Sequence, residues 1–190
     1  MKKTFILVFS ICIAGSVFAQ LKTNAHDWQF HSVNNVGLLE GQTGSAFQVQ
    51  SINGMQYKSW YAGIGLGLDF YRYRTIPLFI DFRKEFGSGA NKFFAYADAG
   101  INFGWLTDNE KTLYLTNDHF SPGFYTDLGL GYKIAVGKNN HLLLGLGYSL
   151  KKLKETYDTN DYSDPPDYPI EKEYIDYNLH RLTMKVGWEF

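Results

Sequence analysis

The chain ends with Arg181-Leu-Thr-Met-Lys-Val-Gly-Trp-Glu-Phe190, in which polar and apolar residues alternate up to the final position. Successive side chains of a β-strand point to opposite faces, so this segment predicts a strand with one apolar and one polar face. The apolar face carries Leu182, Met184, Val186, Trp188 and Phe190. The polar face carries Arg181, Thr183, Lys185, Gly187 and Glu189.

The same alternation recurs upstream and predicts eight strands. We expect them at 32–40, 44–53, 58–71, 76–86, 92–105, 122–134, 140–151 and 179–190. After residue 19 no apolar run is long enough for a transmembrane helix, so any membrane span has to be built from strands. Most of the predicted segments reach the roughly 9–11 residues that a tilted spanning strand needs. The pattern predicts an all-β fold, an eight-stranded antiparallel up-and-down transmembrane β-barrel.

Glycines and charged residues lie on the same face of the predicted strands. This distribution indicates which face points into the barrel. In 58–71 that face carries Tyr61, Gly63, Gly65, Gly67, Asp69 and Tyr71. Glycines facing water would weaken a strand without a packing reason, whereas in a narrow lumen they make room for larger side chains. We therefore expect the apolar face to meet lipid. A soluble lipocalin-like barrel, with the apolar face inside, is the alternative.

Charged residues on this inner face predict a network in the lumen. Its expected members are Asp69, Asp81, Arg83, Glu85, Asp98, Asp127, Lys133, Arg181, Lys185 and Glu189. Enclosed charges oppose folding unless they are paired and hydrogen-bonded, so we expect a salt-bridged plug. Arg83 is expected to bridge several carboxylates, because its planar guanidinium can bond two at once.

The N-terminus has the pattern of a secretory signal. Met1-Lys2-Lys3 is basic, the run up to Gly15 is apolar apart from Ser10, and Val17 and Ala19 suit a signal peptidase. We predict a signal peptide at 1–19, cleaved after Ala19, and one domain at 20–190. An uncleaved anchor is one alternative. A lipoprotein, which would use Cys12, is another, although the bulky Ile11 precedes that cysteine.

The cysteine count and the net charge argue against a thiolate metal site and against nucleic acid as a partner. Cys12 is the only cysteine, so the mature chain has no disulfide or thiolate metal site, and we expect no cofactor. Loss of Lys2 and Lys3 lowers the formal net charge from -1 to -3, which offers no basic field for nucleic acid.

The two longest connections, 106–121 and 152–178, lie outside the cell if the first strand starts in the periplasm. The turns near Gly54-Met55, Gly87-Ser88-Gly89 and Gly137-Lys138 then lie in the periplasm. Aromatic residues suited to the membrane interfaces are Trp60, Phe70, Phe86, Phe93, Trp105, Tyr132 and Trp188.

The connection 152–178 interleaves acidic residues and tyrosines. The aspartates are Asp158, Asp161, Asp164 and Asp167, but the segment lacks the glycine and terminal glutamate of a calcium loop. Tyrosine supplies contact area at low entropic cost. We therefore favour surface recognition over calcium, with Tyr157, Tyr162, Tyr168 and Tyr174 as its residues.

Two stretches carry a family resemblance. Gly63-Ile-Gly-Leu-Gly-Leu-Asp-Phe-Tyr71, followed by Ile76-Pro-Leu-Phe-Ile-Asp-Phe-Arg83, resembles the centre of the small bacterial outer-membrane β-barrel domain family of porin-like and OmpX-like barrels. The last strand also resembles the terminal strand of such barrels, which implies that Trp188 and Phe190 form the signal read by the barrel-assembly machinery. The resemblance covers 32–190 and implies a location in the Gram-negative outer membrane. It implies no catalytic residue.

An enzyme that modifies lipid A is a further alternative. Its candidate residues are His31-Ser32 and Asp118-His119-Phe120-Ser121. A nucleophilic serine needs a histidine within hydrogen-bonding reach and a third group that orients it. On an extended chain His119 and Ser121 share the lumen face, whereas acyl chains lie on the lipid side.

The sequence thus predicts a monomeric outer-membrane barrel without catalysis, whose role is structural or adhesive through the connections 106–121 and 152–178. Expected partners are outer-membrane lipid, the barrel-assembly machinery, and an extracellular protein or glycan. A narrow channel for small solutes or ions is the first alternative, although side chains fill the interior of an eight-stranded barrel.

Overall fold

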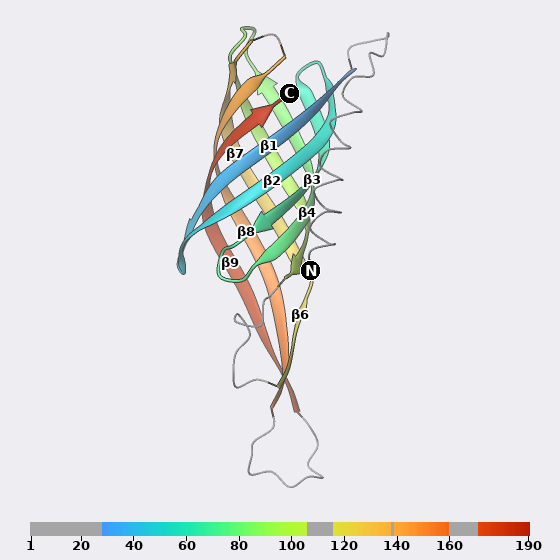
Figure 1. Ribbon diagram of the computed structural model, residues 1–190, viewed down its shortest axis with the longest axis vertical. Coiled ribbons are helices and arrows are strands. Elements are labelled where there is room, and N and C mark those ends of the chain that lie inside the picture. Colours follow the sequence, from blue (N-terminus) through green and yellow to red (C-terminus); the bar gives the residue numbers. More distant parts are fainter. Residues whose placement is uncertain (1–27, 106–115, 138, 160–170) are drawn as a thin grey trace, which may run out of the picture.

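The computed structural model describes residues 28–105, 116–137, 139–159 and 171–190, all of them strand, turn or irregular structure (Figure 1). Within these ranges no helix is long and apolar enough to cross a membrane. The strands are β1 (Trp28–Gly41), β2 (Gly44–Tyr57), β3 (Trp60–Asp69), β4 (Thr75–Phe86), β5 (Lys92–Gly104), β6 (Thr116–Ser121), β7 (Gly123–Ala135), β8 (His141–Thr159) and β9 (Glu171–Glu189). The predicted signal peptide and its cleavage after Ala19 lie outside the described residues.

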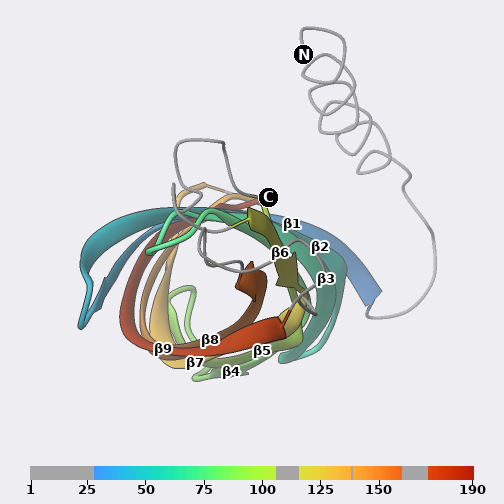
Figure 2. The same ribbon diagram turned by 90° about the horizontal axis from the view of Figure 1, so that it is seen from below.

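Hydrogen-bonded strands form a closed ring in the order β1-β2-β3-β4-β5-β7-β8-β9, and β9 pairs back onto β1 (Figure 2). Every pairing is antiparallel. The short strand β6 pairs with β8 beyond the end of β7 and is separated from β7 only by Pro122. The predicted fold class, an eight-stranded antiparallel barrel, is confirmed.

Alternation sorts the side chains as the sequence pattern predicted. Along β3, odd-numbered residues from Tyr61 to Asp69 are buried, and most of the even-numbered ones are exposed. Large apolar side chains on the outside include Ile64, Phe82, Leu130, Leu146 and Leu182, each more than half exposed. Glycine on the inner face makes room for aromatic rings: a Cβ on Gly65 would lie 2.4 Å from the Phe79 ring.

The predicted turn at Gly54-Met55 is wrong, because both residues lie inside β2. The chain instead turns between Tyr57 and Trp60, where Lys58 adopts a positive φ of 56°. Gly54 serves close packing: a Cβ there would lie 2.3 Å from the carbonyl oxygen of Ala62 on β3.

Both long connections contain more strand than predicted. β6 lies within 106–121, whose residues 106–115 are outside the described part. β8 and β9 continue beyond the barrel, paired from Leu150↔His180 to Thr159↔Glu171. In Figure 1 this outer hairpin projects beyond the barrel at the end opposite the C-terminus. The described part of 152–178 is therefore a β-ribbon.

Candidate functional site: the lumen and the outer hairpin

Lys151 closes the outer end of the lumen. Its side chain is fully buried, and its Nζ lies 3.0 Å from Asp69 Oδ1. The same ammonium lies 2.8 Å from the carbonyl oxygen of Tyr71, 3.1 Å from that of Tyr73 and 3.3 Å from Thr75 Oγ1, so four acceptors share its three N–H donors. One cation therefore holds the connection between β3 and β4 over the lumen.

Arg181 is the second cation on Asp69. Its guanidinium binds the Asp69 carboxylate, donates to Ser149 Oγ at 2.7 Å, and lies 5.5 Å from the centre of the Tyr71 ring. Two buried cations thus share one carboxylate at this end, which makes Asp69 the residue on which both depend.

Three carboxylates lie side by side at the centre of the lumen. Asp81 on β4 is in register with Asp98 on β5, which is in register with Asp127 on β7. Lys185 lies 3.4 Å from Asp98 Oδ2 and 3.0 Å from Asp127 Oδ2. Arg83 binds both oxygens of Asp81. The expected bridge from Arg83 to several carboxylates is therefore replaced by one from Lys185, because the guanidinium turns back along its own strand.

Lys133 bridges two carboxylates at the end of the lumen that lies nearest the C-terminus. Its Nζ lies 2.7 Å from Glu85 Oε1 and 2.6 Å from Glu189 Oε1. Lys92 binds the other Glu85 oxygen at 2.7 Å, and His31 Nδ1 lies 3.0 Å from Glu189. All ten charged residues predicted to line the lumen are buried, and ion pairs join them into four groups that lie in three tiers.

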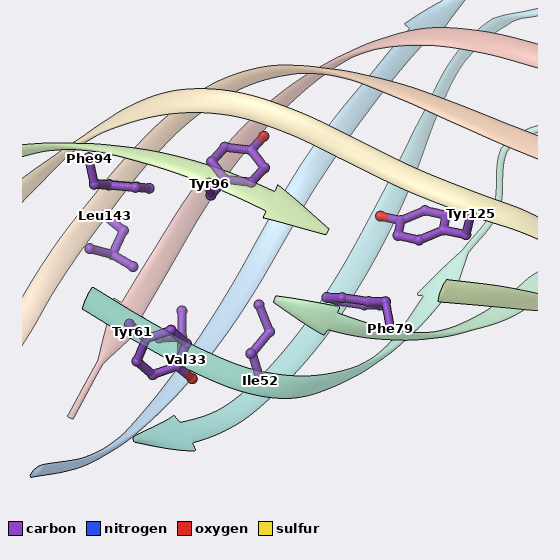
Figure 3. Packing of buried hydrophobic residues seen from close by; sticks show 8 residues of the cluster. All are labelled: Val33, Ile52, Tyr61, Phe79, Phe94, Tyr96, Tyr125 and Leu143. Carbon is purple, nitrogen blue, oxygen red and sulfur yellow. The ribbon is translucent and has the colours of Figure 1, made fainter. Parts of the chain in front are cut away.

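Apolar and aromatic side chains fill the space between the tiers. Figure 3 shows this cluster inside the barrel: Val33, Ile52, Tyr61, Phe79, Phe94, Tyr96, Tyr125 and Leu143. Two cavities adjoin it, both lined by Arg83, Phe94 and Leu143, and each has a volume of about 10 Å³. A volume of this size holds about one water molecule.

Sequence reasoning missed Lys151 as a lumen residue and Glu155 as a buried residue of the outer hairpin. The alternation that runs from His141 to Ser149 continues through both residues, whereas the predicted strand ends at residue 151. Both residues are buried, and Glu155 Oε2 accepts a hydrogen bond from Tyr177 at 2.6 Å. Following the parity through the tyrosine-rich segment would have found them.

An aromatic cluster lies at the outer mouth. Tyr73 packs against Phe120 and Tyr177 with ring centres 5.1 Å apart in each pair, and Arg72 stacks 5.4 Å from the Tyr73 ring. Burial and hydrogen bonds to Glu155 and Tyr73 raise the pKa of the Tyr177 phenol, so it stays a neutral donor. We call Arg72, Tyr73, Phe120 and Tyr177 the outer aromatic cluster.

The predicted recognition tyrosines fall in different places. Tyr174 lies on β9 with 58% of its surface exposed, and Lys154 Nζ lies 4.3 Å from its ring centre. Tyr157 lies in β8, whereas Tyr162 and Tyr168 are outside the described residues. The structure therefore places one of the four side chains on an accessible surface.

The candidate catalytic residues lie on two strands, His31 and Ser32 on β1 and Asp118, His119 and Ser121 on β6, and the side chains of Asp118 and His119 are outside the described part of the chain. His31 binds Glu189, while the backbone of Ser32 pairs with Phe190. His119 and Ser121 lie on β6, opposite Thr156 and Lys154 of β8. No group of three or more His, Cys, Asp or Glu side chains suited to a metal ion occurs among the described residues.

Trp188 and Phe190 both lie on the outer face, 41% and 40% exposed. The backbone of Phe190 exchanges two hydrogen bonds with Ser32 on β1, at 2.9 and 3.0 Å, so the last residue helps to close the ring. Their role as an assembly signal stays a prediction.

A closed antiparallel barrel with an apolar exterior and a packed, ion-paired interior defines the fold of a small outer-membrane β-barrel. The structure is similar to that of Neisserial surface protein A (NspA), with 12% identity, a TM-score of 0.57, and coverage of 88% of this chain and 98% of that one. The outer-membrane protein OprG of Pseudomonas aeruginosa matches at 10% identity and a TM-score of 0.58, over 87% of this chain and 98% of that one.

The N-terminal β-barrel domain of Pseudomonas aeruginosa OprF matches at 10% identity and a TM-score of 0.50, over 87% of this chain and 98% of that one. No protein-family model matches the chain. No curated protein matches it either. At these identities the likeness establishes the fold.

Proposed function

We propose that the protein is a monomeric integral outer-membrane barrel that presents the outer hairpin and the outer aromatic cluster to an extracellular protein or glycan. In this proposal it has no catalytic activity, and its lumen is a structural core. The barrel-assembly machinery would insert it through the strand ending at Phe190.

The filled lumen is the observation that carries this proposal. Three tiers of buried ion pairs and a layer of aromatic and aliphatic side chains occupy the interior, beside cavities of about 10 Å³. A conducting pore needs a continuous water-filled path, and these cavities each hold about one water molecule. The interior therefore supports a structural role more than conduction.

The outer hairpin is suited to presenting side chains to an extracellular partner. β8 and β9 remain paired out to Thr159↔Glu171, so the ribbon is a continuation of the barrel wall. Sites on rigid strands hold their side chains more accurately than sites on loops. Exposed Tyr174, with Lys154 stacked on its ring, lies on this ribbon.

A truncated hairpin tests the proposal. Replacing residues 153–177 by Asn-Gly removes Lys154, Tyr174 and Tyr177 and joins Lys152 to Asn178, which are opposite each other, through a two-residue hairpin turn. We expect the barrel to keep its heat-dependent gel mobility while cells displaying it lose binding to arrayed glycans and extracellular matrix proteins. The matched control is Lys58→Gln in the periplasmic turn, which should bind as the parent does.

Planar bilayers address the channel alternative. The folded parent chain should give no conductance steps. Regular steps from the parent, or equal binding by the parent and the truncated hairpin, would contradict the proposal.

A further inference from the structure

A groove of about 360 Å³ lies on the outside of the barrel, where β6 gives way to β7. Residues from both sides of Pro122 and from the outer hairpin line it: Pro122, Gly123, Phe124, Lys152, Leu153, Lys154, Asp176, Tyr177 and Asn178. Its volume falls within the range of about 300–1,000 Å³ that is common for small-molecule sites.

The groove is built by a break in the strand pairing. Along β8 the register changes between Ser121↔Lys154 and Tyr125↔Lys151, so one extra residue is accommodated around Pro122. Gly123 sits directly on β8, since a Cβ there would lie 2.0 Å from the carbonyl oxygen of Lys152. The bulge separates the two strand segments and leaves a hollow between Phe124 and the hairpin.

The groove lies at the edge of the lipid-facing surface from which the outer hairpin projects. On β8 the outward side chains run Leu144, Leu146 and Tyr148, and continue in the same alternation to Lys152 and Lys154. The two lysines are exposed.

The rest of this edge is polar on the β9 side and apolar on the β7 side. Tyr148 hydrogen-bonds His180 at 2.5 Å, and Asn178 and Asp176 follow His180 toward the tip of the outer hairpin. Phe124 is 49% exposed at the base of the groove. An apolar contact on the barrel side and two ammonium groups on the hairpin side match a lipid whose headgroup carries a phosphate close to its acyl chains.

We propose that this groove binds the phosphorylated headgroup of an outer-leaflet lipid, with Lys152 and Lys154 contacting the phosphate and Phe124 contacting the first acyl carbons. Asp176 lies in the same groove and repels an anion, so the two lysines and this aspartate give the site a net charge of +1. We therefore expect it to favour a headgroup that contacts both lysines. The site shares Lys154 and Tyr177 with the surface of the proposed function and rests on the outward orientation of the hairpin, but its ligand is a lipid of the membrane itself.

Lipid A, a phosphorylated glycolipid of the outer leaflet, is the probe. The detergent-folded chain is stripped of lipid and titrated with lipid A, and bound lipid is counted by native mass spectrometry. Each of Lys152→Gln and Lys154→Gln should weaken binding about fivefold, because a basic residue near an anionic lipid surface contributes about 1 kcal/mol. Lys152→Arg should bind as the parent does.

Lys172→Gln is the matched control, because it removes the same charge from the exposed part of β9 far from the groove. Equal binding by the parent and both groove variants, or equal loss in Lys172→Gln, would overturn the proposal. Unchanged binding of dephosphorylated lipid A would show that the groove does not recognise the phosphate and would overturn that part of the proposal. Displacement of lipid A by equimolar inorganic phosphate would show a free-phosphate site and would overturn the lipid assignment.

Discussion

Replacing Asp69 by asparagine should destabilise the barrel more than any other conservative change at the outer end of the lumen. Asp69 Oδ1 accepts from the Tyr71 backbone N–H at 2.8 Å and from Lys151 Nζ at 3.0 Å, and its second oxygen binds Arg181. The amide keeps the shape and can still accept from Tyr71. It leaves two fully buried cations without the carboxylate that both of them bind.

The size of the effect follows from which charge is left unpaired. Removing one partner of a buried ion pair costs about 3–5 kcal/mol, so Asp69→Asn should lower the free energy of unfolding by that amount. Lys151→Met leaves the pair of Asp69 and Arg181 intact and mainly strips donors from Tyr71 O and Tyr73 O. Its cost should be about 1–3 kcal/mol.

Urea unfolding in lipid vesicles, followed by tryptophan fluorescence, gives these free energies. The double variant Asp69→Asn/Lys151→Met should cost less than the sum of the single changes by about 1–3 kcal/mol, because the two residues are in contact. Asp176→Asn, on the exposed outer hairpin, should stay within about 0.5 kcal/mol of the parent. An Asp69→Asn variant as stable as the parent would refute the reasoning, as would strict additivity in the double variant.

Two pairs of changes test the facing and packing of the barrel. Leu144→Arg, on the lipid face, should cost about 2–4 kcal/mol in the same vesicle assay, whereas Leu150→Arg near the outer rim should cost about 0–1 kcal/mol; equal costs would contradict the membrane placement. Gly65→Ala should cost about 1–3 kcal/mol, because its Cβ would lie 2.4 Å from the Phe79 ring. Gly145→Ala, whose Cβ would meet nothing closer than 3.7 Å, should be near neutral, and a loss as large as that of Gly65→Ala would refute the packing argument.

The sequence predicted which residues face inward because alternation has a period of two and needs no knowledge of neighbouring strands. Asp81, Asp98 and Asp127 were placed in the lumen on this basis alone. Their alignment across three strands depends on register, which is set by turn geometry and packing along the whole wall. The pairing of Lys185 with two of them could therefore not be derived from the pattern.

Local composition misled where tertiary contacts overrode it. Glycine is common in turns, but Gly54 lies inside a strand, where it makes room for Ala62 on the neighbouring strand. The turn itself falls at Lys58. The segment after Lys151 is rich in tyrosine and acidic residues, a composition that predicts a loop. Pairing between β8 and β9 keeps it extended, because each strand satisfies the backbone groups of the other.

The same two strands link the plug to the outer surface. β9 contributes Arg181 to the outer tier, Lys185 to the centre and Glu189 to the opposite end, so its inner face is fixed along the full height of the lumen. Beyond Arg181 the strand continues outward without interruption to Tyr177, which bonds Glu155 of β8. A ribbon anchored in this way has its direction set by the barrel wall. The ion pairs that fill the lumen therefore also give the outer hairpin and the groove beside it a rigid base.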